Sequence, residues 1–66
     1  AMHGLSAKIL DWRAGEGHVR ANGERWQARG DETFAPGETV EVATVSGLTL
    51  MVRRRPDSTA AEGEPP

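Results

Sequence analysis

The chain has 66 residues, with eight basic side chains, ten acidic side chains and no cysteine. A chain of this length forms one domain and buries only about 60% of the surface that its unfolded form exposes, which leaves no room for a deep catalytic cleft. The lack of cysteine excludes a disulfide framework and a zinc ribbon. The formal charge of −2 argues against a module that binds mainly by neutralising phosphates.

Both ends of the chain are expected to lie outside the folded domain. Ala1 precedes Met2, so residues 1–3 are interpreted as an expression-derived or disordered start. Residues 56–66 contain no large apolar side chain and cannot recover by burial the entropy lost on ordering, so a disordered tail is expected there. The predicted domain therefore covers residues 4–55. Its apolar runs are only a few residues long, far short of the ~20 that cross a bilayer.

Between these ends, glycines separate short runs in which apolar and polar residues alternate. This pattern is typical of a β-meander or barrel and disfavours helices. Five strands are predicted, at Leu5 to Trp12, Gly17 to Ala21, Glu24 to Arg29, Thr39 to Val45 and Leu48 to Arg54. The predicted fold class is all-β, a closed barrel of five strands.

The Asn22-Gly23 pair is the strongest turn signal, because a type I′ turn needs a positive φ at both central residues. Such a turn pairs Ala21 with Glu24 and sets the register of the whole hairpin. The core face then receives Gly17, Val19, Trp26 and Ala28, and the outer face receives His18, Arg20, Arg25 and Gln27.

Two further turns are predicted before and after the fourth strand. Pro36-Gly37 favours a type II turn, which leaves Phe34 to close one end of the barrel. For the last hairpin we predict a three-residue loop, Val45 to Gly47, since a two-residue Ser46-Gly47 loop would bury a glutamate. The resulting pairs are Val42 with Leu50 and Val40 with Val52, and the side chains expected to be buried together are Val19, Trp26, Val40, Val42, Leu50 and Val52.

The residue types that catalysis or metal binding needs do not occur in suitable places. Catalysis by a serine needs a hydroxyl beside an oriented base, whereas Ser46 falls in a turn, Ser58 in the tail and His3 at the start of the chain. Two histidines fifteen positions apart, without cysteine, match no metal-ligand spacing. The only lysine, Lys8, lies inside a predicted strand and not at a hairpin tip, as a lipoyl or biotinyl carrier requires. We therefore predict no enzymatic activity, no cofactor and no metal.

Two parts of the surface are candidates for partner contact. The outer face carries His18, Arg20, Arg25 and Arg29, and the directly opposed Arg20 and Arg25 should repel unless they splay into solvent or meet an anion. The simpler interpretation is a solvated face with splayed arginines. Trp12 is the other candidate, because tryptophan is enriched at binding hot spots, with packing at the barrel rim as the alternative.

Arg53-Arg54-Arg55 has two interpretations. Near an anionic membrane each arginine adds about 1 kcal/mol to an existing anchor. Alternatively, the run protects an exposed edge strand from pairing with other chains.

From about Gly4 to Arg54 the sequence resembles the C-terminal soluble domain of NfeD-like membrane proteins. The resemblance is carried by residues 17–29, 36–42 and 45–52, which match a glycine-led strand, a hairpin ending in aromatic-x-Ala, a Gly-x-x-Val-x-Val strand and a Gly-x-x-Leu-x-Val strand. One departure is Trp12-Arg13-Ala14-Gly15, where family members often carry proline. The resemblance implies a five-stranded OB-fold barrel that follows transmembrane helices and associates with stomatin-, prohibitin- or flotillin-like partners.

The leading hypothesis is a non-catalytic protein-interaction domain that contacts such a partner through Trp12, His18, Arg20, Arg25 and Arg29. The isolated domain is expected to be monomeric, with its parent protein anchored in a membrane and the domain on the cytoplasmic side. Some longer relatives also carry a ClpP-like serine protease region, whose nucleophile and base have no counterpart in this sequence. The alternative is a free-standing OB module for single-stranded nucleic acid or another anion. An inward Trp26 argues against nucleic acid, because it leaves no exposed ring for base stacking.

Overall fold

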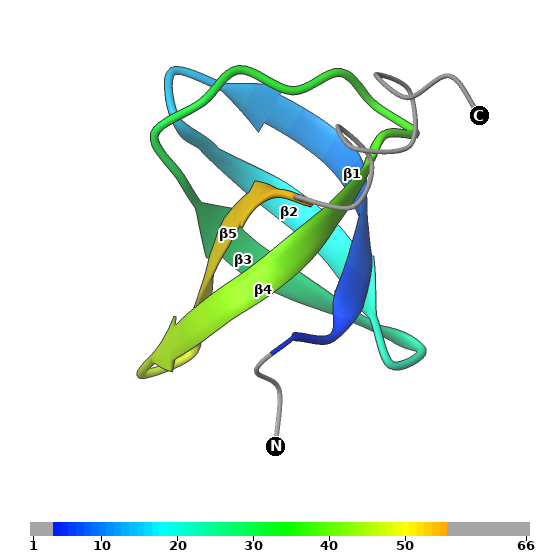
Figure 1. Ribbon diagram of the computed structural model, residues 1–66, viewed down its shortest axis with the longest axis vertical. Helices are drawn as coiled ribbons and strands as arrows, with labels where there is room; N and C mark the ends of the chain where they lie inside the picture. Colours follow the sequence, from blue (N-terminus) through cyan, green and yellow to red (C-terminus); the bar gives the residue numbers. More distant parts are fainter. Residues whose placement is uncertain (1–3, 56–66) are drawn as a thin grey trace, which may run out of the picture.

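The computed structural model describes residues 4–55, which form five strands connected by turns and one longer loop (Figure 1). The strands are β1 (Ser6–Arg13), β2 (Glu16–Ala21), β3 (Glu24–Arg29), β4 (Thr39–Ser46) and β5 (Thr49–Arg54). All five predicted strands are confirmed, with ends shifted by at most one residue. The expected start at 1–3 and tail at 56–66 lie outside the described residues. Within 4–55 there is no helix of the length and apolarity that a membrane span requires.

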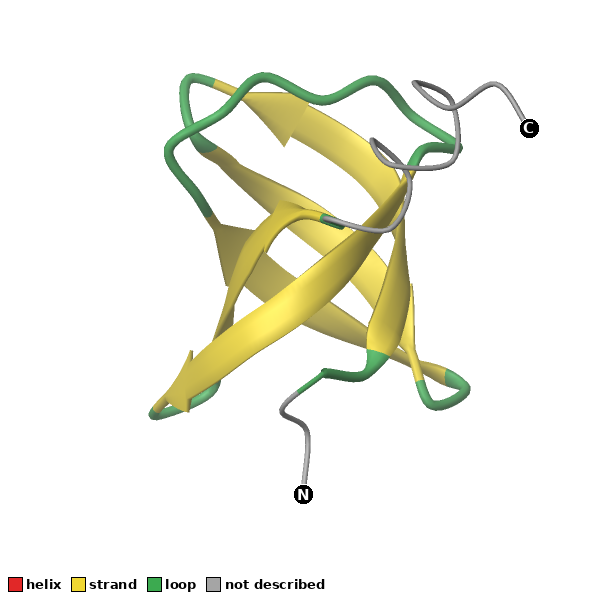
Figure 2. Ribbon diagram, in the orientation of Figure 1, coloured by secondary structure: helices red, strands yellow, loops and turns green. Residues whose placement is uncertain are grey.

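The strands close into a barrel in the order β1-β2-β3-β5-β4. Four of the five contacts are antiparallel, and the contact between β3 and β5 is parallel. The loop of residues 30–38 makes this parallel contact possible, because it carries the chain across one end of the barrel before β4 begins (Figure 2). The arrangement confirms the all-β, five-stranded prediction and is consistent with the OB-fold.

The hairpin of β2 and β3 has the predicted register at every pair, from Ala21 opposite Glu24 to Gly17 opposite Ala28. The φ angles of Asn22 and Gly23 are 54° and 77°, as a type I′ turn requires. The type II turn before β4 is also confirmed, because the Glu38 N–H donates to the Ala35 carbonyl at 3.0 Å and Gly37 has a φ of 92°.

The predicted register of the last hairpin is wrong. Ser46 pairs with Thr49, so the loop is the two-residue Gly47-Leu48, and a positive φ at Gly47 alone fits a type II′ turn. A bulge between Val42 and Thr44 then shifts the ladder by one residue, and Val42 faces Val52 instead of Leu50. The bulge places Val42 inward opposite Val52, whereas an uninterrupted ladder from this turn would pair Val52 with Ala43 and turn Val42 outward.

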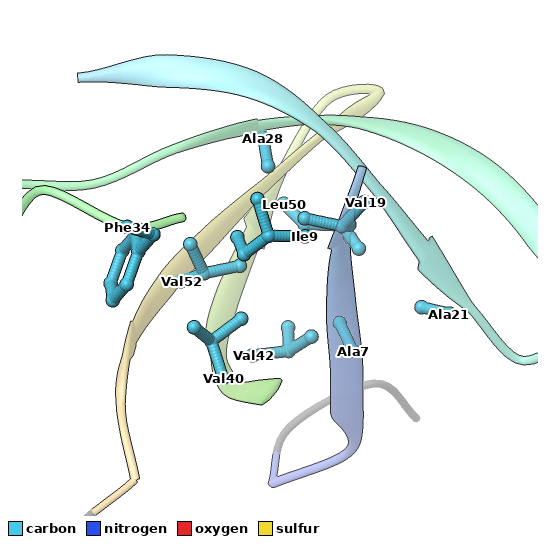
Figure 3. Packing of buried hydrophobic residues seen from close by; sticks show 10 residues of the cluster. All are labelled: Ala7, Ile9, Val19, Ala21, Ala28, Phe34, Val40, Val42, Leu50 and Val52. Carbon is cyan, nitrogen blue, oxygen red and sulfur yellow. The ribbon is translucent and has the colours of Figure 1, made fainter. Parts of the chain in front are cut away.

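The core consists of ten buried side chains that converge from all five strands and from the loop before β4 (Figure 3). Its members are Ala7, Ile9, Val19, Ala21, Ala28, Phe34, Val40, Val42, Leu50 and Val52. Five of the six side chains expected in the core are therefore found there, together with Phe34 at the barrel end.

Trp26 is the exception, because it is only half-buried and packs against the core from its edge. Its backbone has the predicted register opposite Val19. The reason for its exposure is that β5 pairs with β3 only from Gln27 to Arg29, so Trp26 lies where the β3–β5 contact opens. Leu48, the residue before β5, lies on the other side of this opening from Trp26.

Glu38 stabilises the turn at the end of the barrel that Phe34 closes. The Ala35 N–H donates to Glu38 Oε1 at 3.0 Å, and Arg54 Nη1 donates to Glu38 Oε2. The hydrogen bond from Ala35 lowers the pKa of Glu38 below its ordinary 4.5; partial desolvation opposes this and Arg54 adds to it.

A lowered pKa in the folded state makes Glu38 stabilising above pH 4.5, and this contribution is lost as the pH falls through the folded-state value. We expect the free energy of unfolding, measured by urea titration at a series of pH values, to decrease below pH 4.5 less steeply in Glu38→Gln than in wild type. Glu24→Gln, at a carboxylate without an ion pair among residues 4–55, should follow the wild-type curve. Identical curves for Glu38→Gln and wild type would contradict this role.

Candidate interaction surface

The outer faces of β1, β2 and β3 present their polar side chains in three rows that run across the strands. The first row is Lys8, Arg20 and Arg25; the second is Asp11, His18 and Gln27; the third is Arg13, Glu16 and Arg29. Members of a row are direct cross-strand partners, so their side chains start about 5 Å apart. Charge balance within each row can therefore be compared directly.

The second and third rows each contain one carboxylate. His18 Nδ1 lies 3.1 Å and 3.2 Å from the two carboxylate oxygens of Asp11. In the third row Arg29 Nε lies 3.9 Å from Glu16 Oε1. Exposed pairs of this kind contribute only a few tenths of a kcal/mol, up to about 1 kcal/mol. Each of these two rows therefore contains a carboxylate beside a basic side chain, and the third row keeps one cation, Arg13, without an ion pair among residues 4–55.

The first row, called the cationic row below, contains three positive charges and no negative one. Lys8 is opposite Arg20, and Arg20 is opposite Arg25. Among residues 4–55 none of these three side chains forms an ion pair. Two like charges 4 Å apart repel by about 1 kcal/mol even in bulk water, so the side chains gain from splaying or from an anionic ligand. The predicted opposition of Arg20 and Arg25 is present, and Lys8 extends it.

The structure does not bring Trp12 to this surface. Its Nε1 donates to the Glu32 carbonyl at 3.0 Å, and its ring meets Phe34 edge-on, with centroids 5.0 Å apart and an interplanar angle of 77°. Trp12 lies at the end of β1 nearest the third row, away from the cationic row. It therefore packs the barrel rim, the alternative that the sequence left open.

The Arg53-Arg54-Arg55 run is engaged by neighbouring side chains. Arg53 Nε lies 3.2 Å from Glu41 Oε1, and Arg54 contacts Glu32 and Glu38 and lies over the Phe34 ring, 5.1 Å from its centroid. Arg55 donates to Ser6 Oγ at 2.9 Å. All three arginines therefore contact other residues of the barrel.

Besides a hollow of about 340 Å³ beside Lys8, Arg20 and Thr39, two shallow hollows adjoin the outer face. One, of about 390 Å³, lies over β2, β3 and the start of β5 and brings His18 and Arg29 together with Gln27 and Thr49. The other, of about 330 Å³, lies between β3 and the β4–β5 turn and is lined by Glu24, Arg25, Trp26, Gln27 and Leu48. Arg25 therefore belongs to both the cationic row and the second hollow.

Sequence reasoning missed two members of this region. Lys8 was not placed beside Arg20 because the β1–β2 register depends on a bulge between Ile9 and Asp11 and on an Ala14-Gly15 turn. Ala14 has a φ of 51°, which alanine rarely adopts, so its sequence gives a weak turn signal. Leu48 was assigned to a strand, whereas it sits in the turn with 81% of its surface exposed. The alternation of apolar and polar residues along β1 places Lys8 on the outer face, and this was the sequence signal available for it.

The described residues show none of the arrangements that catalysis would use. The side-chain hydrogen bonds of His18 go to Asp11, and within residues 4–55 no serine hydroxyl is hydrogen-bonded to a histidine. The same part of the chain holds no group of three potential metal-ligating side chains.

Comparison with known proteins gives a consistent result. A family model described as "NfeD-like C-terminal, partner-binding domain" matches residues 1–54. The C-terminal domain of stomatin operon partner protein 1510-C from Pyrococcus horikoshii is similar with a TM-score of 0.75 and 36% identity, over 82% of this chain and 88% of that one. The soluble domain of a membrane protein implicated in regulation of membrane protease activity, from Corynebacterium glutamicum, is similar with a TM-score of 0.74 and 37% identity, over 80% and 90%. Among curated proteins there is no match.

Proposed function

Because this chain belongs to the family of NfeD-like C-terminal, partner-binding domains, we propose that it is a non-catalytic domain that binds a stomatin-, prohibitin- or flotillin-like membrane protein. The similar domain from Pyrococcus horikoshii belongs to a stomatin operon partner protein, which supports a partner of this class. The similar domain from Corynebacterium glutamicum is the soluble part of a membrane protein. We also propose that the parent of this chain is anchored in a membrane, as that protein is, and that it presents the barrel on the cytoplasmic side.

The observation that carries the proposal is the uncompensated charge on the outer face of β1–β3. Arg20 and Arg25 are exposed, directly opposed and without an ion pair among the described residues. With His18 and Arg29 they form the proposed contact surface. Trp12, which packs at the rim of the barrel, is a further candidate contact at the edge of that surface.

Barrel closure restricts how a partner can bind. Every strand has a neighbour on both sides, so strand addition at a free edge is not available along most of the sheet. The same closure favours a monomeric isolated domain. Binding must therefore use side chains on the outer face and in the turns.

The test is co-purification from native membranes with the tagged full-length parent protein. A stomatin-, prohibitin- or flotillin-like protein should be recovered with the wild-type parent, and its yield should fall at least several-fold when residues 4–55 are deleted. Detection by mass spectrometry with an untagged control gives the background. If no protein of this class is enriched over that background, the proposed function is wrong.

Binding to single-stranded nucleic acid is the alternative that this proposal has to exclude. The described aromatic residues, Trp12, Trp26 and Phe34, are buried or half-buried, which leaves no exposed ring for base stacking. Titration of a labelled oligothymidylate at low salt separates the two functions. Appreciable binding that weakens steeply with added salt would favour nucleic acid.

A further inference from the structure

We infer that the cationic row and the hollow between Trp26 and Leu48 form one site, which binds an acidic segment of a partner protein that carries an apolar side chain beside its carboxylates. The inference rests on the proposed function, since it specifies what the partner presents. It concerns a surface that includes Lys8, Trp26 and Leu48 in addition to Arg20 and Arg25.

The charge of the cationic row is the first reason. Neighbouring strands lie about 4.8 Å apart, so Lys8, Arg20 and Arg25 spread three positive charges over about 10 Å. Each of the two rows beside it contains a carboxylate that contacts a basic side chain of the same row. A row of three cations without any carboxylate is complementary to a short run of carboxylates, and arginine binds carboxylates with two parallel hydrogen bonds.

The apolar hollow next to the row is the second reason. Leu48 is 81% exposed at the tip of the β4–β5 turn, and Val45, at the end of β4, is 38% exposed. These are the exposed large hydrophobic side chains in residues 4–55, and Leu48 faces Trp26 across the hollow. An aliphatic side chain from a partner would fill the space between Leu48 and Trp26. Its own apolar surface and that of these two residues would then be removed from water.

The indole nitrogen of Trp26 is the third reason. It is buried and has no hydrogen-bond partner among the described residues, unlike Trp12 Nε1, which donates to a backbone carbonyl. A buried N–H without an acceptor is unfavourable by about 1–3 kcal/mol. A carbonyl oxygen of a bound segment that reached this nitrogen would supply the missing acceptor.

The composition of the site favours a protein over a nucleic acid. Three cations are few for a phosphate-binding groove, and the exposed side chain of the hollow is aliphatic, not aromatic. The chain itself contains one competing anionic segment, because Asp57, Glu62 and Glu64 follow the barrel in the sequence. That segment and an oligonucleotide are the alternative occupants that the experiment separates.

The probe is a fluorescein-labelled synthetic peptide with a leucine followed by four glutamates, and its control replaces the glutamates with glutamines. Binding to the complete 66-residue chain is measured by fluorescence anisotropy at low salt. The acidic peptide should bind, and the Arg20→Glu/Arg25→Glu variant should weaken this binding by about tenfold, because two attractive contacts become repulsive. The Leu48→Ser variant should weaken it by about threefold or more through loss of apolar contact.

The matched control is Arg13→Glu/Arg53→Glu, which changes the net charge by the same amount at two exposed arginines outside the site. It should change the peptide affinity less than about twofold, with circular dichroism confirming the fold of each variant. Equal weakening by the two double variants would reduce the effect to net charge and overturn the inference. Tight binding of the glutamine peptide or stronger binding of an oligothymidylate would overturn it as well.

Two further arms separate the competing explanations. If the peptide binds only after Asp57→Asn, Glu62→Gln and Glu64→Gln are introduced together, the chain's own acidic segment occupies the site and the inference is wrong. In the membrane co-purification, Arg20→Glu/Arg25→Glu should reduce recovery of the partner. Undiminished recovery would overturn the inference and leave the proposed function standing, whereas no partner with the wild-type protein would overturn the proposed function.

Discussion

Replacing Leu50 with alanine is expected to lower the free energy of unfolding by about 2–5 kcal/mol. Leu50 is completely buried in the core, so the variant loses the transfer free energy of the removed atoms and leaves a cavity among close-packed neighbours. A chain of this size has a total stability of only about 3–10 kcal/mol. Urea unfolding followed by tryptophan fluorescence should show a much lower midpoint, or a population that is already unfolded without urea.

The matched control is Leu48→Ala, because it removes the same atoms two residues earlier in the chain. Leu48 is 81% exposed, and exposed substitutions usually change stability by less than about 0.5 kcal/mol. A similar loss in both variants would show that Leu48 is packed as tightly as Leu50, contrary to the structure. The pair therefore tests the turn that sequence reasoning placed incorrectly.

Gly17→Ala is expected to lower the stability by about 3 kcal/mol, at the upper end of the range for overpacked sites. A Cβ at this position would lie 2.0 Å from the Asp11 carbonyl oxygen and 2.8 Å from the Trp12 Cα. These are backbone atoms of the neighbouring strand, so no side-chain rotation can relieve the contact. Thermal unfolding by circular dichroism should show a large decrease in the midpoint temperature.

Gly23→Ala separates this steric effect from the general effect of replacing glycine. A Cβ at Gly23 would meet nothing within 4 Å, and the only penalty is its φ of 77°, which is unfavourable for alanine by about 1–2 kcal/mol. Gly17→Ala should therefore be the more destabilising variant. The reverse order would mean that β1 and β2 are farther apart than the structure has them.

The fold was predictable where a short turn fixes the register and failed where a bulge intervenes. Asn22-Gly23 has one well-defined turn geometry, so the pairs of β2 and β3 followed from it directly. In the last hairpin, the bulge adds an extra residue near Ala43 and has no sequence signature. It offsets the shift in strand pairing that the Gly47-Leu48 turn would otherwise cause. The inward side chains of β4 and β5 were predicted correctly, whereas the cross-strand pairs that they form were not.

The candidate surface was predictable to the same extent. Arg20 and Arg25 follow from the confirmed hairpin, whereas Lys8 depends on the bulged pairing of β1 with β2. The half-burial of Trp26 depends on where β5 begins beside β3, a contact between distant segments that alternation alone does not locate. Sequence reasoning therefore found the charge of the site and missed its apolar part.

The two contacts that close the barrel also determine how the chain can reach this fold. β1 meets β4 through residues 6–8 and 39–41, and β3 meets β5 through residues 27–29 and 49–51, whereas the hairpins join segments that are close in sequence. Neither non-local contact exists until most of the chain is in place, and such contacts slow folding because loop-closure entropy is lost first. The hairpins can form early, but the interior stays open to water until both short contacts form, so folding should be slow for a chain of this length and cooperative from end to end.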